Sequence, residues 1–118
     1  MTRKIHAILN PNAGGGYASN IWPHVKSTFS DYDFTYSITQ KHGDAELFAE
    51  EAIIRGAEFI AVVGGDGTLN EVVQSCAREN IVVIPVSAGT GSDFIRNFSI
   101  NREESIRDMI DGDTFVNI

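Results

Sequence analysis

Residues 58–73 read EFIAVVGGDGTLNEVV, and this stretch predicts the fold of the chain. Its first half, Phe59 to Val63, is an apolar run without polar interruption, which is typical of a strand covered on both faces by helices in a parallel sheet. After the glycines, apolar residues return at the spacing of one helix face, at Leu69, Val72, Val73, Cys76 and Ala77. We therefore expect a buried strand that ends in a glycine turn and continues as a helix packed on the sheet.

The turn between this strand and this helix is Gly64-Gly65-Asp66-Gly67-Thr68. Glycine permits a positive φ and lets a ligand approach the backbone without meeting a Cβ. The N-terminus of the following helix offers unpaired N–H groups and the positive end of its dipole. The turn is therefore a candidate phosphate site. A capping box explains Thr68 and Glu71 about equally well, but it does not explain the three glycines together.

Two other predicted strands run into glycine loops in the same way. Lys4–Leu9 is followed by residues 10–16, NPNAGGG, and Ile81–Val86 is followed by residues 87–91, SAGTG. A further predicted strand, Asp33–Thr39, ends at a threonine whose hydroxyl can face the same site. Because the carboxyl ends of parallel strands lie at one edge of a sheet, these loops can converge on one ligand.

The remaining segments complete an alternation of strands and helices. Helical patterns cover residues 19–29, with Pro23 near the first turn, and residues 44–56, where Asp44 is expected to cap or favour the helix start. Pro85 lacks an N–H and is expected at the end of its strand. A last helix and a strand at 114–118 follow. The alternation predicts a three-layer α/β/α sandwich with a mostly parallel sheet of about five strands, whose order it leaves open.

Composition and charge limit the classes of function. A chain of 118 residues fits one domain, and Cys76, its single cysteine, is expected in the core. The net charge of −7 with scattered basic residues argues against a nucleic-acid partner, so an anionic ligand must be held locally by amides, a few cations or a metal. The apolar segment after the N-terminus is too short for a signal peptide or an integral membrane segment, and we expect a cytoplasmic protein.

The motif order NP-x-x-G-x-G, T-x-x-x-G-D-A, GGDGTLNEVV and GTG-x-DF resembles the diacylglycerol kinase catalytic domain family, which includes bacterial lipid kinases and the sphingosine and ceramide kinases. The GGDGT motif alone is shared with NAD kinases and phosphofructokinases. The resemblance implies transfer of the γ-phosphoryl group of ATP to a lipid hydroxyl. It also implies an ATP site made by Asn10, Asn12, Ala13, Gly14, Gly15, Gly16, Thr39, Gly64, Gly65, Asp66, Gly67, Thr68, Leu69, Asn70, Glu71, Gly89 and Thr90.

Asp66 is the candidate catalytic residue of this site. A carboxylate beside ATP phosphates is repelled unless Mg²⁺ or a proton intervenes. Asp66 is therefore expected to hold Mg²⁺, directly or through water, or to accept the proton of the lipid hydroxyl. Glu71 either supports the metal or caps its helix. Asp93 and Arg96 are weaker candidates.

Kinases of this family continue into a β-rich second domain that contributes lipid contacts. We expect residues 1–118 to be the nucleotide-binding domain of a lipid kinase without that lipid-binding domain, and to have little or no activity alone. One alternative is a stand-alone, non-catalytic nucleotide-binding module that forms a homodimer through exposed surface. A less favoured alternative is an NAD kinase-like domain.

Overall fold

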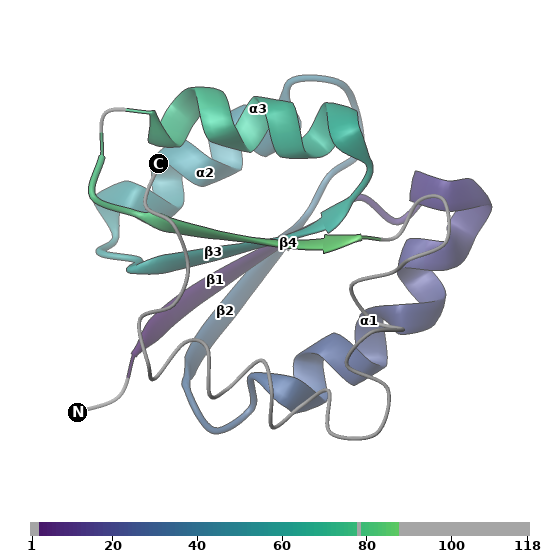
Figure 1. Ribbon diagram of the computed structural model, residues 1–118, viewed down its shortest axis with the longest axis horizontal. Coiled ribbons are helices and arrows are strands. Elements are labelled where there is room, and N and C mark those ends of the chain that lie inside the picture. Colours follow the sequence, from purple (N-terminus) through teal and green to yellow (C-terminus); the bar gives the residue numbers. More distant parts are fainter. Residues whose placement is uncertain (1–2, 78, 88–118) are drawn as a thin grey trace.

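The computed structural model describes residues 3–77 and 79–87. Strands and helices alternate along this part of the chain, as the apolar patterns predict (Figure 1). A short 3₁₀ segment at Ala13–Gly16 precedes the first helix. The elements in chain order are β1 (Lys4–Leu9), α1 (Tyr17–Thr28), β2 (Asp33–Ile38), α2 (Asp44–Ile54), β3 (Phe59–Gly64), α3 (Asp66–Cys76) and β4 (Val82–Ser87).

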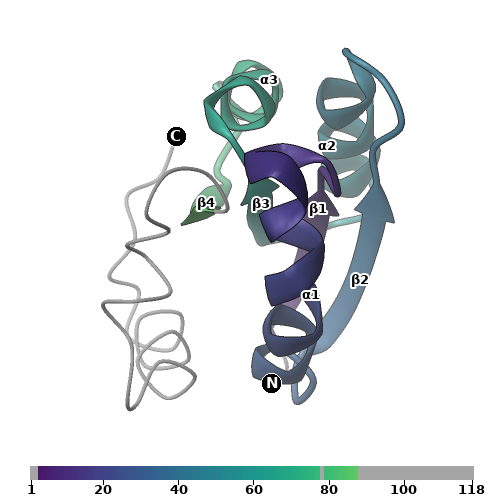
Figure 2. The ribbon, with the colours of Figure 1, turned by 90° about the vertical axis from the view of Figure 1, so that its right-hand side faces the viewer.

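The four strands form one parallel sheet in the order β2-β1-β3-β4. The helices α2 and α3 lie together over one face of the sheet, and α1 lies over the other (Figure 1 and Figure 2). The expected α/β sandwich with a parallel sheet is therefore confirmed. The expected fifth strand, at 114–118, and the helix before it lie outside the described residues.

Alternate residues of β3 face opposite helical layers, and all six of its residues are buried. Phe59, Ala61 and Val63 belong to the cluster that α1 covers, whereas Ile60 and Val62 belong to the cluster beneath α2 and α3. This two-sided burial explains why the strand reads as an unbroken apolar run. Cys76 lies in the second cluster, where burial and, to a smaller extent, the charge of Glu79 raise the pKa of its thiol to about 11.

Three local expectations differ from the structure. The first helix begins at Tyr17, so Pro23 lies beyond its first turn. Pro85 lies inside β4, opposite Val62, and is tolerated there because β4 is an edge strand of the described sheet. The Asp44 carboxylate does not cap α2; its Oδ2 accepts the N–H groups of Gln40, at 2.8 Å, and Lys41, at 3.1 Å. Asp44 therefore shapes the loop before its helix.

The central strands β1 and β3 are neighbours, but the chain leaves them in opposite directions. After β1 it continues into α1 on one face, and after β3 it continues into α3 on the other face (Figure 2). Such a switch opens a crevice at the carboxyl ends of the strands, where open α/β sheets bind their ligands. Within the described ranges, no helix is long and apolar enough to cross a membrane.

Candidate functional site

The loops that follow β1 and β2 meet at this crevice. They form a cleft of about 330 Å³ together with residues at the start of α2 and in the first two turns of α3. Loops far apart in the sequence are thus joined, as expected from the parallel arrangement of their strands. The cleft is lined by Asn10, Asn12, Thr39, Gln40, Lys41, His42, Ala45, Gly67, Thr68 and Glu71.

Asn10 links the loop after β1 to the neighbouring strand and helix. Its backbone N–H donates to the carbonyl of Val63 at 2.9 Å, and its Nδ2 donates to Thr68 Oγ1 at 3.1 Å. Its Oδ1 accepts the N–H of Asn12 at 3.2 Å. Because the side-chain amide bonds to Thr68 and Asn12 at the same time, Asn10 fixes the distance across the crevice between β1 and α3.

Glu71 links α3 to the loop after β2. Its Oε1 accepts the N–H of Gly43 at 3.1 Å, and its Oε2 lies 3.1 Å from Nδ1 of His42. The Glu71 side chain is 14% exposed, whereas that of His42 is 96% exposed. Glu71 therefore holds the loop through the backbone of Gly43, with a solvent-exposed contact to the His42 side chain added at the surface.

The capping-box explanation of Thr68 and Glu71 is wrong. The helix begins at Asp66 with Gly65 as its N-cap, which places Thr68 inside the helix and not before it. Thr68 is buried and accepts the Asn10 amide. Neither side chain bonds to the N-terminus of the helix. The first amides of α3 therefore have no side-chain cap among the described residues.

The glycines of the central turn meet different physical demands. A Cβ built on Gly64 would lie 3.0 Å from the side chain of Thr68, so a larger residue there would force Thr68 to shift. Gly65 is extended, Gly67 is helical, and neither has a positive φ. A Cβ on either would meet no described heavy atom within 4 Å. The described part of the fold therefore does not require these two glycines, and the space beside them is open to a ligand.

The loop of residues 12–16 uses glycine for its backbone conformation. Gly14, Gly15 and Gly16 have φ values of 62°, 66° and 99°. This left-handed conformation is costly for other residues. The three glycines turn the chain into α1 beside the cleft. Asn12 lines the cleft, whereas Ala13 and the glycines, in the 3₁₀ segment that follows, do not.

Asp66 is the exposed first residue of α3, directly after the carboxyl end of β3, and it does not line the cleft. Among the described residues, no group of three or more histidines, cysteines and carboxylates could hold a metal. The site therefore fits Mg²⁺ only in its common mode, with one or two protein carboxylates and the remaining ligands from phosphates and water.

The other predicted residues divide into three groups. Leu69 is half-buried and packs on the core, and Asn70 is exposed outside the cleft lining. Gly65 and Gly64 shape the turn as described above. Gly89, Thr90, Asp93 and Arg96 lie outside the described residues.

Sequence reasoning did not identify four of the lining residues: Gln40, Lys41, His42 and Ala45. Lys41 brings a cation to the cleft of an acidic chain, and His42, expected to be solvated, is exposed but paired with Glu71. The position of these residues in the chain could have identified them, because they follow Thr39 at the end of a predicted strand. Loops at the carboxyl ends of parallel strands line the crevice, whatever their residue types.

Comparison with known proteins gives consistent matches. The family model described as "Diacylglycerol kinase catalytic domain" matches residues 4–114. The diacylglycerol kinase of Bacillus subtilis (strain 168) is 35% identical over 111 residues, which cover 89% of this chain and 36% of that protein. The diacylglycerol kinase of Staphylococcus carnosus (strain TM300) is 37% identical over 102 residues, covering 81% and 33%. The chain thus spans about a third of the length of these curated relatives.

Solved structures agree with this assignment of the fold. A crystal structure of a diacylglycerol kinase from Bacillus anthracis str. Sterne superposes with a TM-score of 0.63 at 28% identity, covering 93% of this chain and 42% of that one. The solution structure of a phosphate-loop protein superposes with a TM-score of 0.58 at 23% identity, covering 91% and 95%. The second match shows the fold alone.

Proposed function

The chain belongs to the diacylglycerol kinase catalytic domain family, and on that premise we propose that residues 1–118 are the nucleotide-binding domain of a lipid kinase. In this proposal the cleft binds ATP, and the kinase transfers the γ-phosphoryl group of ATP to the hydroxyl of a lipid. The lipid would be held by a further domain, and the protein would work in the cytoplasm, where ATP is available.

The observation that carries the proposal is the open space at Gly65 and Gly67. Within the described residues, a phosphate can approach these backbone positions without meeting a side chain, and the first amides of α3 beside them have no side-chain cap. The positive end of the helix dipole favours an anion at the same place. Neither the packing nor the φ values of the described residues accounts for these two glycines.

The surrounding residues suit a nucleotide in charge and rigidity. Because the chain carries a net charge of −7, phosphates must be attracted by local groups, and Lys41 supplies a cation at the cleft. Asn10 holds the loop after β1 against α3, and Glu71 holds the loop after β2 there, before the ligand arrives. Phosphoryl transfer depends mainly on positioning and on neutralising charge, which is what this arrangement provides.

Asp66 would hold Mg²⁺ together with the phosphates, directly or through water. The bound ion would neutralise phosphate charge. The alternative role, acceptance of the lipid hydroxyl proton by Asp66, needs the acceptor in place. Because alignment of that acceptor depends on a lipid-binding domain, we expect little or no phosphorylation by this chain alone.

Isothermal titration calorimetry with ATP, with and without Mg²⁺, tests the proposal. We expect Mg²⁺-dependent binding that Asp66→Ala weakens at least about tenfold, a loss of about 1.4 kcal/mol. Glu50→Ala is the matched control, because it removes an exposed carboxylate from α2 outside the cleft lining. Absence of ATP binding by a folded chain would refute the nucleotide site. Equal loss in both variants would mean that only net charge matters.

A second assay separates a kinase domain from a non-catalytic module. Diacylglycerol phosphorylation would be measured with the chain alone and in a longer polypeptide that carries a lipid-binding domain of a relative. Activity that appears only in the longer protein supports the proposal. Inactivity of that protein, with its relative's own domain pair active as a control, would favour a non-catalytic nucleotide-binding module.

A further inference from the structure

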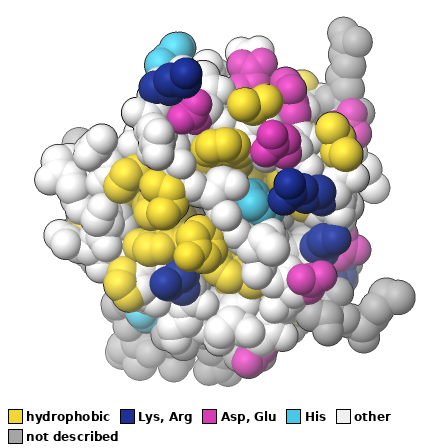
Figure 3. All heavy atoms as spheres, turned by 180° about the vertical axis from the view of Figure 1, so that it is seen from behind, with side chains coloured by type: hydrophobic (Ala, Val, Ile, Leu, Met, Phe, Trp, Pro, Cys, Tyr) yellow, Lys and Arg dark blue, Asp and Glu magenta, His cyan; other side chains and the backbone are white. Residues whose placement is uncertain are grey.

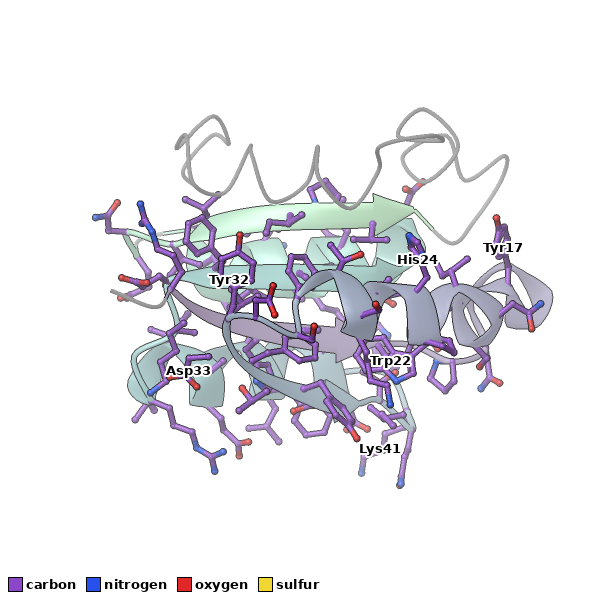
Figure 4. The ribbon with its side chains drawn as sticks, turned by 90° about the horizontal axis from the view of Figure 1, so that it is seen from below. Tyr17, Trp22, His24, Tyr32, Asp33 and Lys41 are labelled. Atoms are coloured by element: carbon purple, nitrogen blue, oxygen red, sulfur yellow. The ribbon has the colours of Figure 1, made fainter. Side chains whose placement is uncertain are left out.

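A second cavity, of about 200 Å³, lies at the opposite end of the sheet from the cleft. Lys4 and Asp33, the first residues of β1 and β2, are register partners there, and Arg55 follows the last residue of α2. Basic and acidic side chains gather beside a histidine on this side of the molecule (Figure 3). Asp33 and the cleft residue Lys41 lie toward opposite ends of β2 (Figure 4). We call this cavity the His6 pocket. None of its lining residues lines the cleft, and they are Lys4, His6, Asp33, Thr35, Ala52, Arg55 and Ala57.

His6 forms the buried floor of this pocket and is 8% exposed. Side chains of a strand point alternately to opposite faces, so His6 shares a face of the sheet with Ile8, beneath α2 and α3. Its Nδ1 lies 2.7 Å from Oγ1 of Thr35, and its Nε2 lies 2.8 Å from Oγ of Ser37. Both ring nitrogens are thus hydrogen-bonded to hydroxyls, which donate or accept as the protonation of the ring requires.

Three charged side chains reach the His6 pocket from three elements, Lys4 from β1, Asp33 from β2 and Arg55 from the end of α2. Nζ of Lys4 donates to the carbonyl of Arg55 at 2.7 Å and so balances the negative end of the α2 dipole. The nearby carboxylate of Glu58 accepts the backbone N–H of Lys4 at 3.1 Å. None of the three charged side chains forms an ion pair with another described residue. Their charges are therefore available to a ligand.

We propose that the His6 pocket binds hydrogen phosphate, HPO₄²⁻. The guanidinium of Arg55 and the ammonium of Lys4 hold the phosphate oxygens, because the planar fork of an arginine matches an oxyanion and a lysine adds a second cation. The carboxylate of Asp33 accepts the proton of the P–OH group. Sites for drug-sized ligands measure about 300–1,000 Å³, so this smaller pocket suits a small ion.

Asp33 makes the pocket selective for an oxyanion that carries a proton. A carboxylate repels a neighbouring anionic oxygen, but it accepts a hydrogen bond from a P–OH group. Hydrogen phosphate keeps its proton at neutral pH. Sulfate carries none, and a phosphate monoester loses its last proton at about pH 6. At about pH 7.5 the pocket therefore prefers inorganic phosphate to both of these ions.

His6 is the positioning residue of this site. When Nδ1 carries the ring proton, it donates to Oγ1 of Thr35, and the hydroxyl hydrogen of Thr35 is then free to donate to the ion. In the same tautomer Nε2 accepts the hydroxyl of Ser37. Burial and, to a smaller extent, the charge of Arg55 lower the pKa of His6, so the ring is neutral at about pH 7.5. The bound ion therefore selects the tautomer with the proton on Nδ1.

Titration calorimetry and amide NMR with sodium phosphate, at about pH 7.5, test the proposal. We expect phosphate to bind with a Kd below about 1 mM and to shift the amide signals of Thr35 and Gly56. Arg55→Gln should raise this Kd at least about tenfold. It is a cleaner variant than a change of Lys4, whose Nζ also bonds to the backbone. Lys26→Gln is the matched control, because it removes an exposed cation from α1, on the other face of the sheet (Figure 2).

Two further measurements test the roles of individual residues. Sulfate should bind at least about tenfold more weakly than phosphate, and Asp33→Asn should remove most of this difference, because it removes the carboxylate charge. The nitrogen resonances of the His6 ring should show the ring proton moving to Nδ1 as phosphate is added. A merely structural histidine would keep the tautomer that it has in the free chain. Circular dichroism confirms that each variant folds.

Three outcomes would overturn the proposal. The first is no change in the signals of Thr35 and His6 at about 10 mM phosphate. Shifts confined to the amides at the start of α3 belong to this outcome, since they would place the ion in the cleft and leave the proposed nucleotide site intact. The second is an equal loss of affinity in Arg55→Gln and Lys26→Gln, which would leave net charge as the only cause. The third is sulfate binding as tight as phosphate binding in the unmodified chain.

Discussion

Gly67→Ala tests whether Gly67 is needed for phosphate binding or for the stability of the fold. Gly67 lies inside α3, its φ is not positive, and a Cβ there meets no described atom within 4 Å. Alanine should therefore stabilise the free chain by about 0.4–1 kcal/mol, because it lowers the entropy of the unfolded state. With an unfolding entropy of about 0.25 kcal/mol/K for 118 residues, Tm should rise by about 2–4 °C.

The same methyl group should hinder the proposed phosphate. We expect the Kd for Mg²⁺–ATP to rise at least about tenfold in Gly67→Ala, because the methyl occupies the space through which the phosphate reaches the amides of α3. Differential scanning calorimetry gives the Tm, and titration calorimetry gives the Kd. The variant would thus gain stability while losing affinity, a combination that general damage to the fold does not produce.

Gly56→Ala is the matched control for this pair of measurements. Gly56 follows α2 with a φ of 93°, before the start of β3 and thus at the opposite edge of the sheet from the cleft. Alanine should cost about 1 kcal/mol there and leave the Kd unchanged. Unchanged ATP affinity in Gly67→Ala would refute the placement of the phosphate. A lowered Tm in that variant would contradict the inference that the space beside Gly67 is open.

Two further predictions concern the loop after β2 and the sheet beneath α2. Glu71→Ala should lower the free energy of unfolding by about 1 kcal/mol and speed hydrogen exchange of the Gly43 amide, whereas Glu71→Gln, which keeps an acceptor oxygen, should exchange nearly as the unmodified chain does. Equal exchange in both variants would contradict this role. Burial and, to a smaller extent, the charge of Arg55 lower the pKa of His6. The unfolded chain therefore binds the proton at higher pH, and stability should fall as pH drops below about 6.5. Urea unfolding at pH 7.5 and pH 5 should show a smaller fall for His6→Gln, and an equal fall would assign the effect to other groups.

The sequence predicted the layers of the fold because burial leaves a direct pattern. Residues 59–63 face helices on both sides and are therefore all apolar, and the strand–helix alternation specifies a parallel sheet. The strand order β2-β1-β3-β4 could not be predicted, since no local pattern records which strands are neighbours. The same limit explains Pro85, which reads as a strand end but is tolerated inside an edge strand.

The sequence predicted those site residues that lie at the ends of strands. It did not predict the residues that are brought together by tertiary contacts. Asn10, Thr39 and Thr68 follow or flank strand ends, and the structure brings them to one cleft. The contact between Glu71 and Gly43 joins residues 28 positions apart, and only the packing of α3 beside α2 creates it. The sequence therefore offered a helix cap or a metal as the partner of Glu71, and it did not indicate the contact with Gly43.

The glycines of the two loops occur for different structural reasons, which the sequence motif alone does not distinguish. Gly14, Gly15 and Gly16 are favoured by their left-handed backbone, and Gly64 by its close contact with Thr68. Gly65 and Gly67 satisfy neither requirement within the described residues. A sequence presents all of these residues as one class, although only the last two leave space that the fold does not use. Substitutions of Gly65 and Gly67 can therefore test whether a glycine is needed for phosphate binding. Substitutions elsewhere in the glycine-rich loops would also disturb the fold.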